Sequence, residues 1–230
     1  MIEKEEVKEY YDDFINHQEK IGISTRQRII AKNVKKVGVK NDANILEIGC
    51  GIGTVSKLLI KMIPNGQFVG CDISPKSIAY AKQFNPNNNA AFIVTDMSDF
   101  THDLKFDLVV FPDVLEHIPV DQHFNLFENV AKVCSSNAKW YINIPEPHAL
   151  NYSRENNPEL LQIIDQSLSM QDLLNNVYPH GFVVESIIPY TIHMSSPNYL
   201  KIIFTNNPKV NKLTLRNKFV NIWQNFTSKI

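Results

Sequence analysis

The sequence predicts an α/β fold: a doubly wound, seven-stranded, mostly parallel sheet with helices on both faces and a C-terminal antiparallel hairpin. Three observations predict it. Short apolar segments alternate with helical segments through the middle of the chain, as they do in parallel sheets. A glycine-rich turn at 49–53 follows the first apolar segment. Acidic residues follow several of these segments, at positions where the strand ends of such a sheet come together.

The elements follow in order along the chain. Before the sheet, helical spacing of apolar and aromatic residues predicts one helix around residues 7–14 and a second over 24–37. Apolar runs of strand length predict parallel strands at 45–48, 68–71, 91–94, 106–111 and 140–144. The helices expected between them lie at 54–62, 75–84 and 120–135. Ser74-Pro75 marks a helix start, because Ser favours the N-cap and Pro the first helical position.

The alternation of strand and helix ends after residue 144. A proline-containing connection is expected over 145–167, and Ser169-x-x-Asp172 then begins a last helix. Two late strands, at 182–188 and 199–205, account for the antiparallel hairpin. Residues 208–230 carry five positive charges, no acid and apolar residues at helical spacing. Such a basic amphipathic tail can lie on an anionic membrane, but we expect it to pack on its own domain or on a twin subunit.

Composition limits the class of protein. The 230 residues suit one domain with a small appendage, and a net charge of −1 argues against bulk nucleic-acid binding. The N-terminus shows no apolar signal region, and no apolar run reaches membrane-spanning length. Cys50, Cys71 and Cys134 lack metal-ligand spacing and are typical of a reducing compartment. We therefore expect a cytoplasmic protein that uses no metal.

The turn after the first strand indicates a nucleoside site. Its alternating glycines, Gly49, Gly51 and Gly53, let the backbone turn sharply and let a ligand lie against it. Asp72 ends the second strand, 19 residues beyond Gly53. Doubly wound folds place at this point the carboxylate that binds two ribose hydroxyls.

Charge favours one cofactor over the others. Five acidic residues are expected at the same sheet edge: Glu47, Asp72, Asp96, Asp113 and Glu116. These carboxylates would repel a pyrophosphate but suit S-adenosylmethionine, which has no phosphate and carries a sulfonium and an ammonium. Thr54 also stands where the dinucleotide fingerprint has Gly or Ala. A dehydrogenase remains a rival interpretation.

With these residues and the run Pro112-Asp113-Val114-Leu115-Glu116-His117, the chain resembles the class I S-adenosylmethionine-dependent methyltransferases from about residue 44 to 144, and more loosely to 205. The resemblance implies a methyltransferase domain over 41–207, with S-adenosylmethionine as cofactor and S-adenosylhomocysteine as product. It also implies that residues 1–40 form a helical lid over the cleft. The cofactor contacts that it implies are Glu47, Gly49, Gly51, Gly53, Asp72, Ile73, Asp96, Met97 and the backbone of Pro112.

Within this assignment Glu47 organises the ammonium, Asp72 takes both ribose hydroxyls, and Asp96 receives the exocyclic amine of adenine. The Met97 amide is expected to contact the adenine ring. Each role has a structural counterpart that needs no ligand. A strand-end Asp is often a helix N-cap, and Asp96 could be a simple turn residue.

The acceptor side is less well determined. A hydroxyl acceptor loses its proton as the new bond forms, so a histidine beside the methyl group helps. His117 is the first candidate for this general base and His148 the second, although His117 could instead bond a nearby carbonyl. The acceptor contacts that we expect are Tyr11, Asp113, Glu116, Tyr152 and Arg154. Arg26 and Arg28, like Arg154, could clamp an anionic acceptor.

We therefore predict a small-molecule methyltransferase that acts on an oxygen of a sugar or phosphorylated metabolite. The run at 112–117 lacks the Asn/Asp-Pro-Pro-Tyr/Phe motif of the nitrogen-methylating branch, which disfavours N-methylation without excluding it. A protein or RNA methyltransferase of the same fold, or a non-catalytic binding subunit, would also carry these cofactor motifs.

Overall fold

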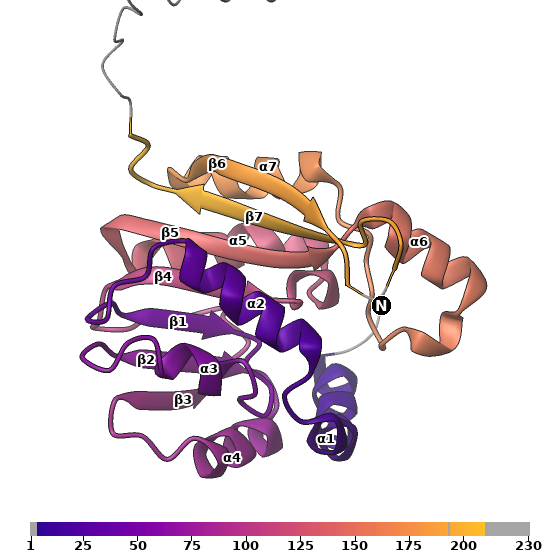
Figure 1. The fold of residues 1–230 in the computed structure, drawn as a ribbon, viewed down its shortest axis with the longest axis horizontal. Coiled ribbons are helices and arrows are strands. Elements are labelled where there is room, and N and C mark those ends of the chain that lie inside the picture. Colours follow the sequence, from indigo (N-terminus) through magenta and orange to yellow (C-terminus); the bar gives the residue numbers. More distant parts are fainter. Residues whose placement is uncertain (1–3, 193, 210–230) are drawn as a thin grey trace, which may run out of the picture.

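One seven-stranded sheet forms the centre of the protein, with the strand order β3-β2-β1-β4-β5-β7-β6 (Figure 1). The structure is a computed structural model that describes residues 4–192 and 194–209, so most of the predicted tail lies outside the described residues. The strands are β1 (Ile45–Ile48), β2 (Phe68–Asp72), β3 (Ala90–Val94), β4 (Phe106–Pro112), β5 (Cys134–Pro145), β6 (Val183–Tyr190) and β7 (Tyr199–Thr205). Strands β1 to β5 pair in parallel, and β7 runs antiparallel to both β5 and β6. This confirms the predicted doubly wound sheet with its C-terminal hairpin.

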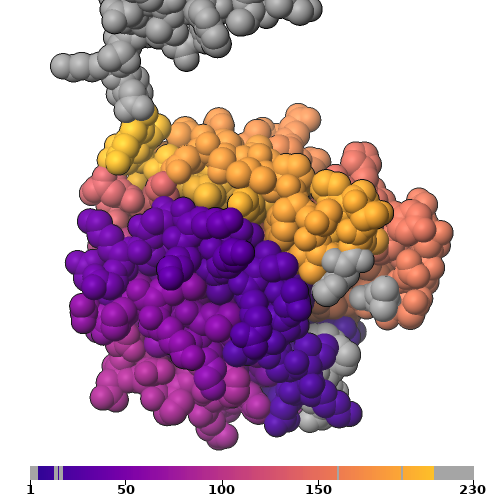
Figure 2. Space-filling view, viewed as in Figure 1, coloured from indigo at the N-terminus to yellow at the C-terminus, as the bar shows by residue number. Residues whose placement is uncertain are grey.

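Helices cover both faces of the sheet (Figure 1). The α-helices are α1 (Lys4–Ile21), α2 (Thr25–Lys36), α3 (Ser56–Ile60), α4 (Pro75–Phe84), α5 (His123–Lys132), α6 (Pro147–Asn156) and α7 (Met170–Val177). Short 3-10 turns are η1 (Leu115–His117), η2 (Val120–Gln122), η3 (Pro158–Leu160) and η4 (Tyr178–His180). Figure 2 shows the same face, on which residues near the N-terminus, in indigo, form the surface between the magenta and the yellow parts of the chain. Among the described residues, no helix is long and apolar enough to cross a bilayer.

Two hydrophobic cores lie on opposite faces of the sheet, because successive strand residues point to opposite sides. Ile45 of β1 belongs to the core beneath α2, α3 and α4. Its neighbour Leu46 belongs to the other core, beneath α5 and α7. There the Trp140 ring stacks on Phe127 and Phe182, with centroid distances of 5.3 and 3.8 Å. Both faces of β1 are buried, and for this reason all of its residues except Glu47 are apolar.

Three elements differ from the prediction. The helix expected over 54–62 is limited to α3, because residues before Ser56 form turns. The helix expected over 120–135 ends at Lys132, and Cys134 instead begins β5, where it pairs with Phe106. The connection at 145–167 contains α6. Its Pro147 occupies the first helical turn rather than breaking a helix, and Glu146 caps the Ala149 N–H at 2.9 Å.

Helix α1 is fixed beside the carboxyl ends of the parallel strands. Asp12 Oδ1 accepts a hydrogen bond from Ser74 Oγ at 2.5 Å, and Asp12 Oδ2 lies 3.6 Å from Lys76 Nζ. Ser74 is the N-cap of α4 and accepts from the Ser77 N–H at 2.9 Å. The N-terminal segment is therefore attached to the start of the helix that follows β2.

Gly53 offers a test of this packing. Its φ of 81° is left-handed, and a Cβ there would collide with the Asn85 amide and lie 3.2 Å from Ala81 Cβ on α4. We expect Gly53→Ala to lower the free energy of unfolding by about 2 kcal/mol more than Gly38→Ala. Gly38 is a matched control, since its φ is 90° and an added Cβ meets nothing within 4 Å. Urea unfolding measures both. Equal losses of unfolding free energy in the two variants would mean that α4 moves to accommodate the added methyl group without further loss of stability.

Candidate functional site

A cavity of about 730 Å³ opens at the carboxyl edge of the parallel strands, within the size range of small-molecule sites. The turn after β1 and the ends of β2, β3 and β4 form its floor. Helices α1 and α2 and part of the segment 159–164 form its walls. The described residues contain no group of three or more His, Cys, Asp or Glu side chains placed to hold a metal ion.

The glycine turn shapes the floor of the cavity. Gly49 and Gly51 line it with φ values of 71° and 51°. A side chain at Gly49 would collide with Val114, so the turns after β1 and β4 lie in direct contact. Gly53 is absent from the described cavity lining and packs against α4 instead. The contact with α4 therefore requires a glycine at this position, and the expected contact of Gly53 with the cofactor stays a prediction.

Asp72 connects the glycine turn to the end of β2. Its Oδ2 accepts the Gly51 N–H at 2.8 Å, and its Oδ1 accepts the Ser74 N–H at 2.9 Å. Burial raises the pKa of this carboxyl group, while the backbone hydrogen bonds oppose the rise. Each oxygen keeps acceptor capacity for a ligand hydroxyl. The next residue, Ile73, also lines the cavity.

Glu47 has an unsatisfied acceptor at the cavity. The side chain is fully buried, and its Oε2 accepts a hydrogen bond from Ser56 Oγ at 2.6 Å. Its Oε1 has no hydrogen-bond partner among the described residues. Burial raises the pKa of Glu47 to about 8. An orphaned buried acceptor of this kind fits a ligand that brings a positively charged donor.

The turn after β3 differs in part from its expected geometry. Asp96 Oδ1 accepts from both Ser98 N–H and Ser98 Oγ, at 2.9 and 2.6 Å. The Met97 N–H, expected to contact an adenine ring, donates to Thr95 Oγ1 at 2.9 Å. Met97 also has a φ of 66°. Both residues line the cavity, but the amide of Met97 already has a partner.

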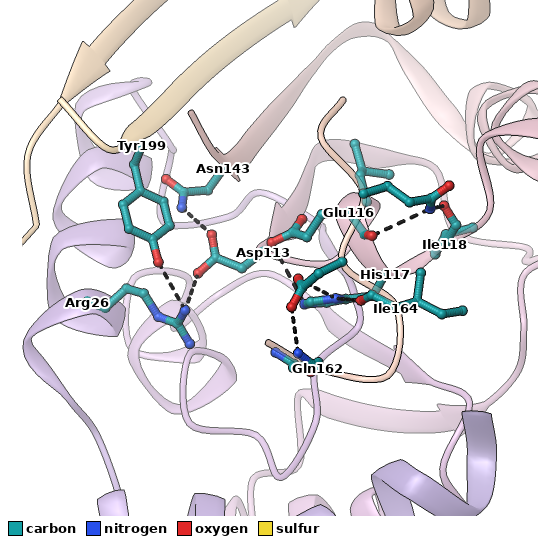
Figure 3. Close-up of polar contacts among 12 residues, drawn as sticks. Arg26, Asp113, Glu116, His117, Ile118, Asn143, Gln162, Ile164 and Tyr199 are labelled. Atoms are coloured by element: carbon teal, nitrogen blue, oxygen red, sulfur yellow. Dashed lines mark hydrogen bonds and ion pairs between the residues drawn. The ribbon is translucent and has the colours of Figure 1, made fainter. Parts of the chain in front are cut away.

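The turn after β4 holds an ion pair that crosses the cavity edge (Figure 3). Asp113 follows Pro112 with a φ of 56°, and its Oδ2 lies 3.2 Å from Nη1 of Arg26 on α2. Its other oxygen accepts a hydrogen bond from the Asn143 amide. Arg26 also donates to Tyr199 Oη at 3.3 Å. Asp113 raises the pKa of Arg26, which is the one Lys or Arg among the described residues lining the cavity.

His117 lies at the far wall of the cavity with its ring held on one side (Figure 3). Its Nδ1 is 2.5 Å from the Ile164 carbonyl oxygen and 3.3 Å from Asp165 Oδ1. A carbonyl can only accept, so the Nδ1 carries the proton and the Nε2 keeps its lone pair. That Nε2 lies 3.8 Å from Glu116 Oε1, beyond hydrogen-bond distance. Burial lowers the pKa of His117.

Two buried polar atoms beside His117 have no hydrogen-bond partner among the described residues: Glu116 Oε2 and Tyr11 Oη. Burial and the charge of Asp113 raise the pKa of Glu116 well above its ordinary value, which favours its neutral form. Burial likewise raises the pKa of Tyr11, whose ring centroid lies 6.3 Å from that of His117. Tyr11 lines the cavity, and so this end can receive a polar group.

Three predicted acceptor-side residues lie elsewhere. His148 and Tyr152 border a separate surface depression next to residues 194–197, because α6 carries them away from the cavity. Arg154 instead holds the connection after α6, donating from Nη2 to the Asp165 carbonyl at 2.7 Å. The structure therefore does not bring the second candidate base, His148, or the expected acceptor contacts Tyr152 and Arg154 to this cavity. The connection itself provides the wall, through Glu159, Leu161, Gln162 and Ile164.

Sequence reasoning missed several residues of the site. Asn143, Tyr190 and Asp165 carried no local signal, because their partners come from distant parts of the chain. Asn143 Oδ1 accepts from Tyr190 Oη at 2.5 Å and from Tyr141 Oη at 3.2 Å. The sequence offers Arg26, Arg28 and Arg154 as candidate arginines and does not distinguish Arg26 from Arg28 on the same helix.

Comparison with known proteins finds that the chain is similar to methyltransferases. Residues 45–137 match the protein family described as "Methyltransferase domain". A malonyl-[acyl-carrier protein] O-methyltransferase of Ilyobacter polytropus is 34% identical over 94 residues, which cover 40% of this chain and 34% of that protein. A trans-aconitate 2-methyltransferase of Escherichia coli is 26% identical over 121 residues, covering 53% of this chain and 46% of that protein. The chain thus spans from about a third to just under half of these relatives.

Solved structures agree over a longer stretch. Magnesium protoporphyrin IX methyltransferase from Synechocystis, crystallised with bound S-adenosylhomocysteine, superposes with a TM-score of 0.67 at 17% identity. The match covers 89% of this chain and 99% of that one. A putative methyltransferase in complex with its Trm112 activator, from Haloferax volcanii, gives a TM-score of 0.71 at 15% identity, with the same coverage of 89% and 99%.

The raised pKa of Glu47 predicts a pH-dependent stability. In the folded protein the pKa of Glu47 is about 8, above the ordinary value of a glutamate. The stability that depends on protonated Glu47 is therefore fully present at pH 4 and is lost as pH rises through 8. We expect Glu47→Gln to become more stable relative to the wild-type protein between about pH 5 and pH 9. Urea unfolding at several pH values measures this difference, with exposed Glu155→Gln as control. A difference that does not change with pH would contradict the assignment.

Proposed function

We propose that this chain is a class I S-adenosylmethionine-dependent methyltransferase and that it methylates an oxygen of a small-molecule acceptor. The acceptor that we propose is a hydroxyl compound, a sugar or a phosphorylated metabolite. The observation that carries the proposal is that one cavity contains two suitable carboxyl groups. Glu47 has a buried oxygen without a hydrogen-bond partner among the described residues, and Asp72 lies where a carboxylate would bind ribose hydroxyls. The O-methyltransferase among the relatives supports oxygen as the acceptor atom.

The charges of the cavity suit each part of S-adenosylmethionine. Glu47 would hold the ammonium through its free Oε1, and Asp72 would bind the ribose hydroxyls. Gly49 and Gly51 would let the amino-acid part lie against the backbone. Arg26 would bind the carboxylate of the methionine part, because it is the Lys or Arg that the described lining offers. Asp96 and Ile73 would contact the adenine.

The acceptor would bind at the opposite end, between α1 and the 159–164 wall. When bound, S-adenosylmethionine supplies a methyl carbon activated by its sulfonium. That carbon would pass to the acceptor oxygen as the carbon–sulfur bond breaks, with the electron pair of that bond staying on sulfur. His117 Nε2 takes the hydroxyl proton, since its Nδ1 proton is held by Ile164. Tyr11 and its neighbour Tyr10 line this end and exclude water.

Titration calorimetry with S-adenosylhomocysteine tests the cofactor assignment. We expect the wild-type protein to bind and Asp72→Ala to weaken binding roughly 100-fold or more, because two charge-assisted hydrogen bonds to ribose are lost. Asp42→Ala is the control, since Asp42 is exposed and precedes β1 at the other end of the sheet. No binding to the wild-type protein would overturn the proposed function. Equal binding by both variants would remove Asp72 from the site.

A second titration isolates the role of Arg26. We expect Arg26→Gln to weaken S-adenosylhomocysteine binding by roughly tenfold or more, through loss of a charged contact to the ligand carboxylate. Binding of methylthioadenosine, which lacks the amino-acid part, should change little. Arg28→Gln provides a control on the same helix, because Arg28 is exposed. If Arg26→Gln weakens both ligands equally, Arg26 supports the cavity as a whole and does not bind the carboxylate.

A further inference from the structure

The connection between α6 and α7 closes onto the turn after β4 at several points. The Gln166 N–H donates to the Glu116 carbonyl at 2.9 Å, and its Nε2 donates to the Ile118 carbonyl at 2.7 Å. His117 Nδ1 donates to the Ile164 carbonyl at 2.5 Å. The connection therefore bonds to the residues on both sides of His117 and to its ring. Although the connection is remote from His117 in sequence, it contacts the candidate base directly.

Asp165 lies within this contact and is itself held in place. Its Oδ2 accepts the Gln162 N–H at 2.6 Å, and its backbone carbonyl accepts from Arg154 Nη2 at 2.7 Å. Its Oδ1 lies 3.3 Å from His117 Nδ1, and both side chains are only 10% exposed. A carboxylate with one oxygen anchored and the other beside an imidazole N–H has a fixed orientation toward that ring.

We propose that Asp165 is the positioning residue of His117: it orients the imidazole with Nε2 as the free base and stabilises the imidazolium that forms when His117 takes the acceptor proton. The inference rests on the proposed function, in which His117 is the general base. The proton moves from the acceptor hydroxyl to Nε2 as the carbon–oxygen bond forms. The positive charge created on the ring is then balanced by the carboxylate beside Nδ1.

Several other groups act on His117, and Asp165 is the closest of its acidic partners. Glu116 faces Nε2 from the same turn at 3.8 Å, and Asp113 contributes from the end of β4. Arg26 on α2 opposes protonation of the ring, and Tyr11 on α1 presents a ring 6.3 Å away. Burial favours the neutral imidazole, whereas Asp165 favours the charged one. Removing the carboxylate should make His117 less basic.

Nuclear magnetic resonance on protein labelled with ¹⁵N-histidine tests this without a known acceptor. The chain has seven histidines, and the signals absent from His117→Gln identify those of His117. We expect Asp165→Asn and Asp165→Ser to lower the titration midpoint of His117 by roughly one pH unit. Asp165→Glu, which retains the charge, should recover most of that shift. Asp121→Asn, which removes an exposed carboxylate from η2, should leave the midpoint unchanged.

Two results would overturn the proposal. One is a His117 midpoint in Asp165→Asn equal to that of the wild-type protein. The other is a midpoint in Asp165→Glu as low as in Asp165→Asn, which would indicate a change of packing rather than of charge. S-adenosylhomocysteine binding, measured on the same samples, distinguishes a failure of the Asp165 proposal from a failure of the proposed function. Lack of binding by the wild-type protein would refute the proposed function, while the titration would still report whether Asp165 acts on His117.

Discussion

The structure depends on how several carboxylates are accommodated at one edge of the sheet. Charges of one sign cannot remain together in a poorly solvated site unless each is protonated, paired or bound to a ligand. The described residues show the first two solutions. Glu116 is held toward its neutral form by burial, and Asp113 is paired with Arg26 at 3.2 Å. Asp72 is satisfied in part by backbone N–H groups, and Glu47 keeps one oxygen free. Bound S-adenosylmethionine would complete that compensation.

Residues with left-handed backbone conformation gather at the same edge of the sheet. Gly49, Gly51 and Gly53 have left-handed φ values, and so do Met97 and Asp113, two residues with side chains. Left-handed conformations cost free energy for residues other than glycine, and they are retained where surrounding contacts enforce them. Asp113 is held by contacts to Asn143 and Arg26, so its strain and its ion pair belong to one arrangement. Thus the turns in which the backbone is strained are also the turns that carry polar side chains at the cavity.

How much the sequence could predict follows from the range of the interactions. Strand β1, its glycine turn and helix α4 follow from local patterns, such as Ser74-Pro75 at a helix start. The sequence does not predict helix α6, because Pro145, Pro147 and Pro158 lie in and around it and proline is typical of helix ends, whereas Pro147 lies in the first turn of the helix. Asp165 could not be found, since its link to His117 spans 48 positions in the sequence. Arg26 differs from Arg28 only in the direction that α2 gives each side chain.

The two halves of the cavity therefore have different origins. The floor that suits the cofactor is built from short turns directly after β1, β2, β3 and β4, each close in sequence to the strand that positions it. The opposite wall comes from α1 and from the connection after α6, which is joined to the turn after β4 by side-chain and backbone hydrogen bonds. Because this wall does not contribute to the strand pairing of the sheet, its residues can change while the floor is preserved. Under the proposed function, acceptor choice would be set by the segment that also holds the candidate base, so changes in that segment would act on specificity and on catalysis together.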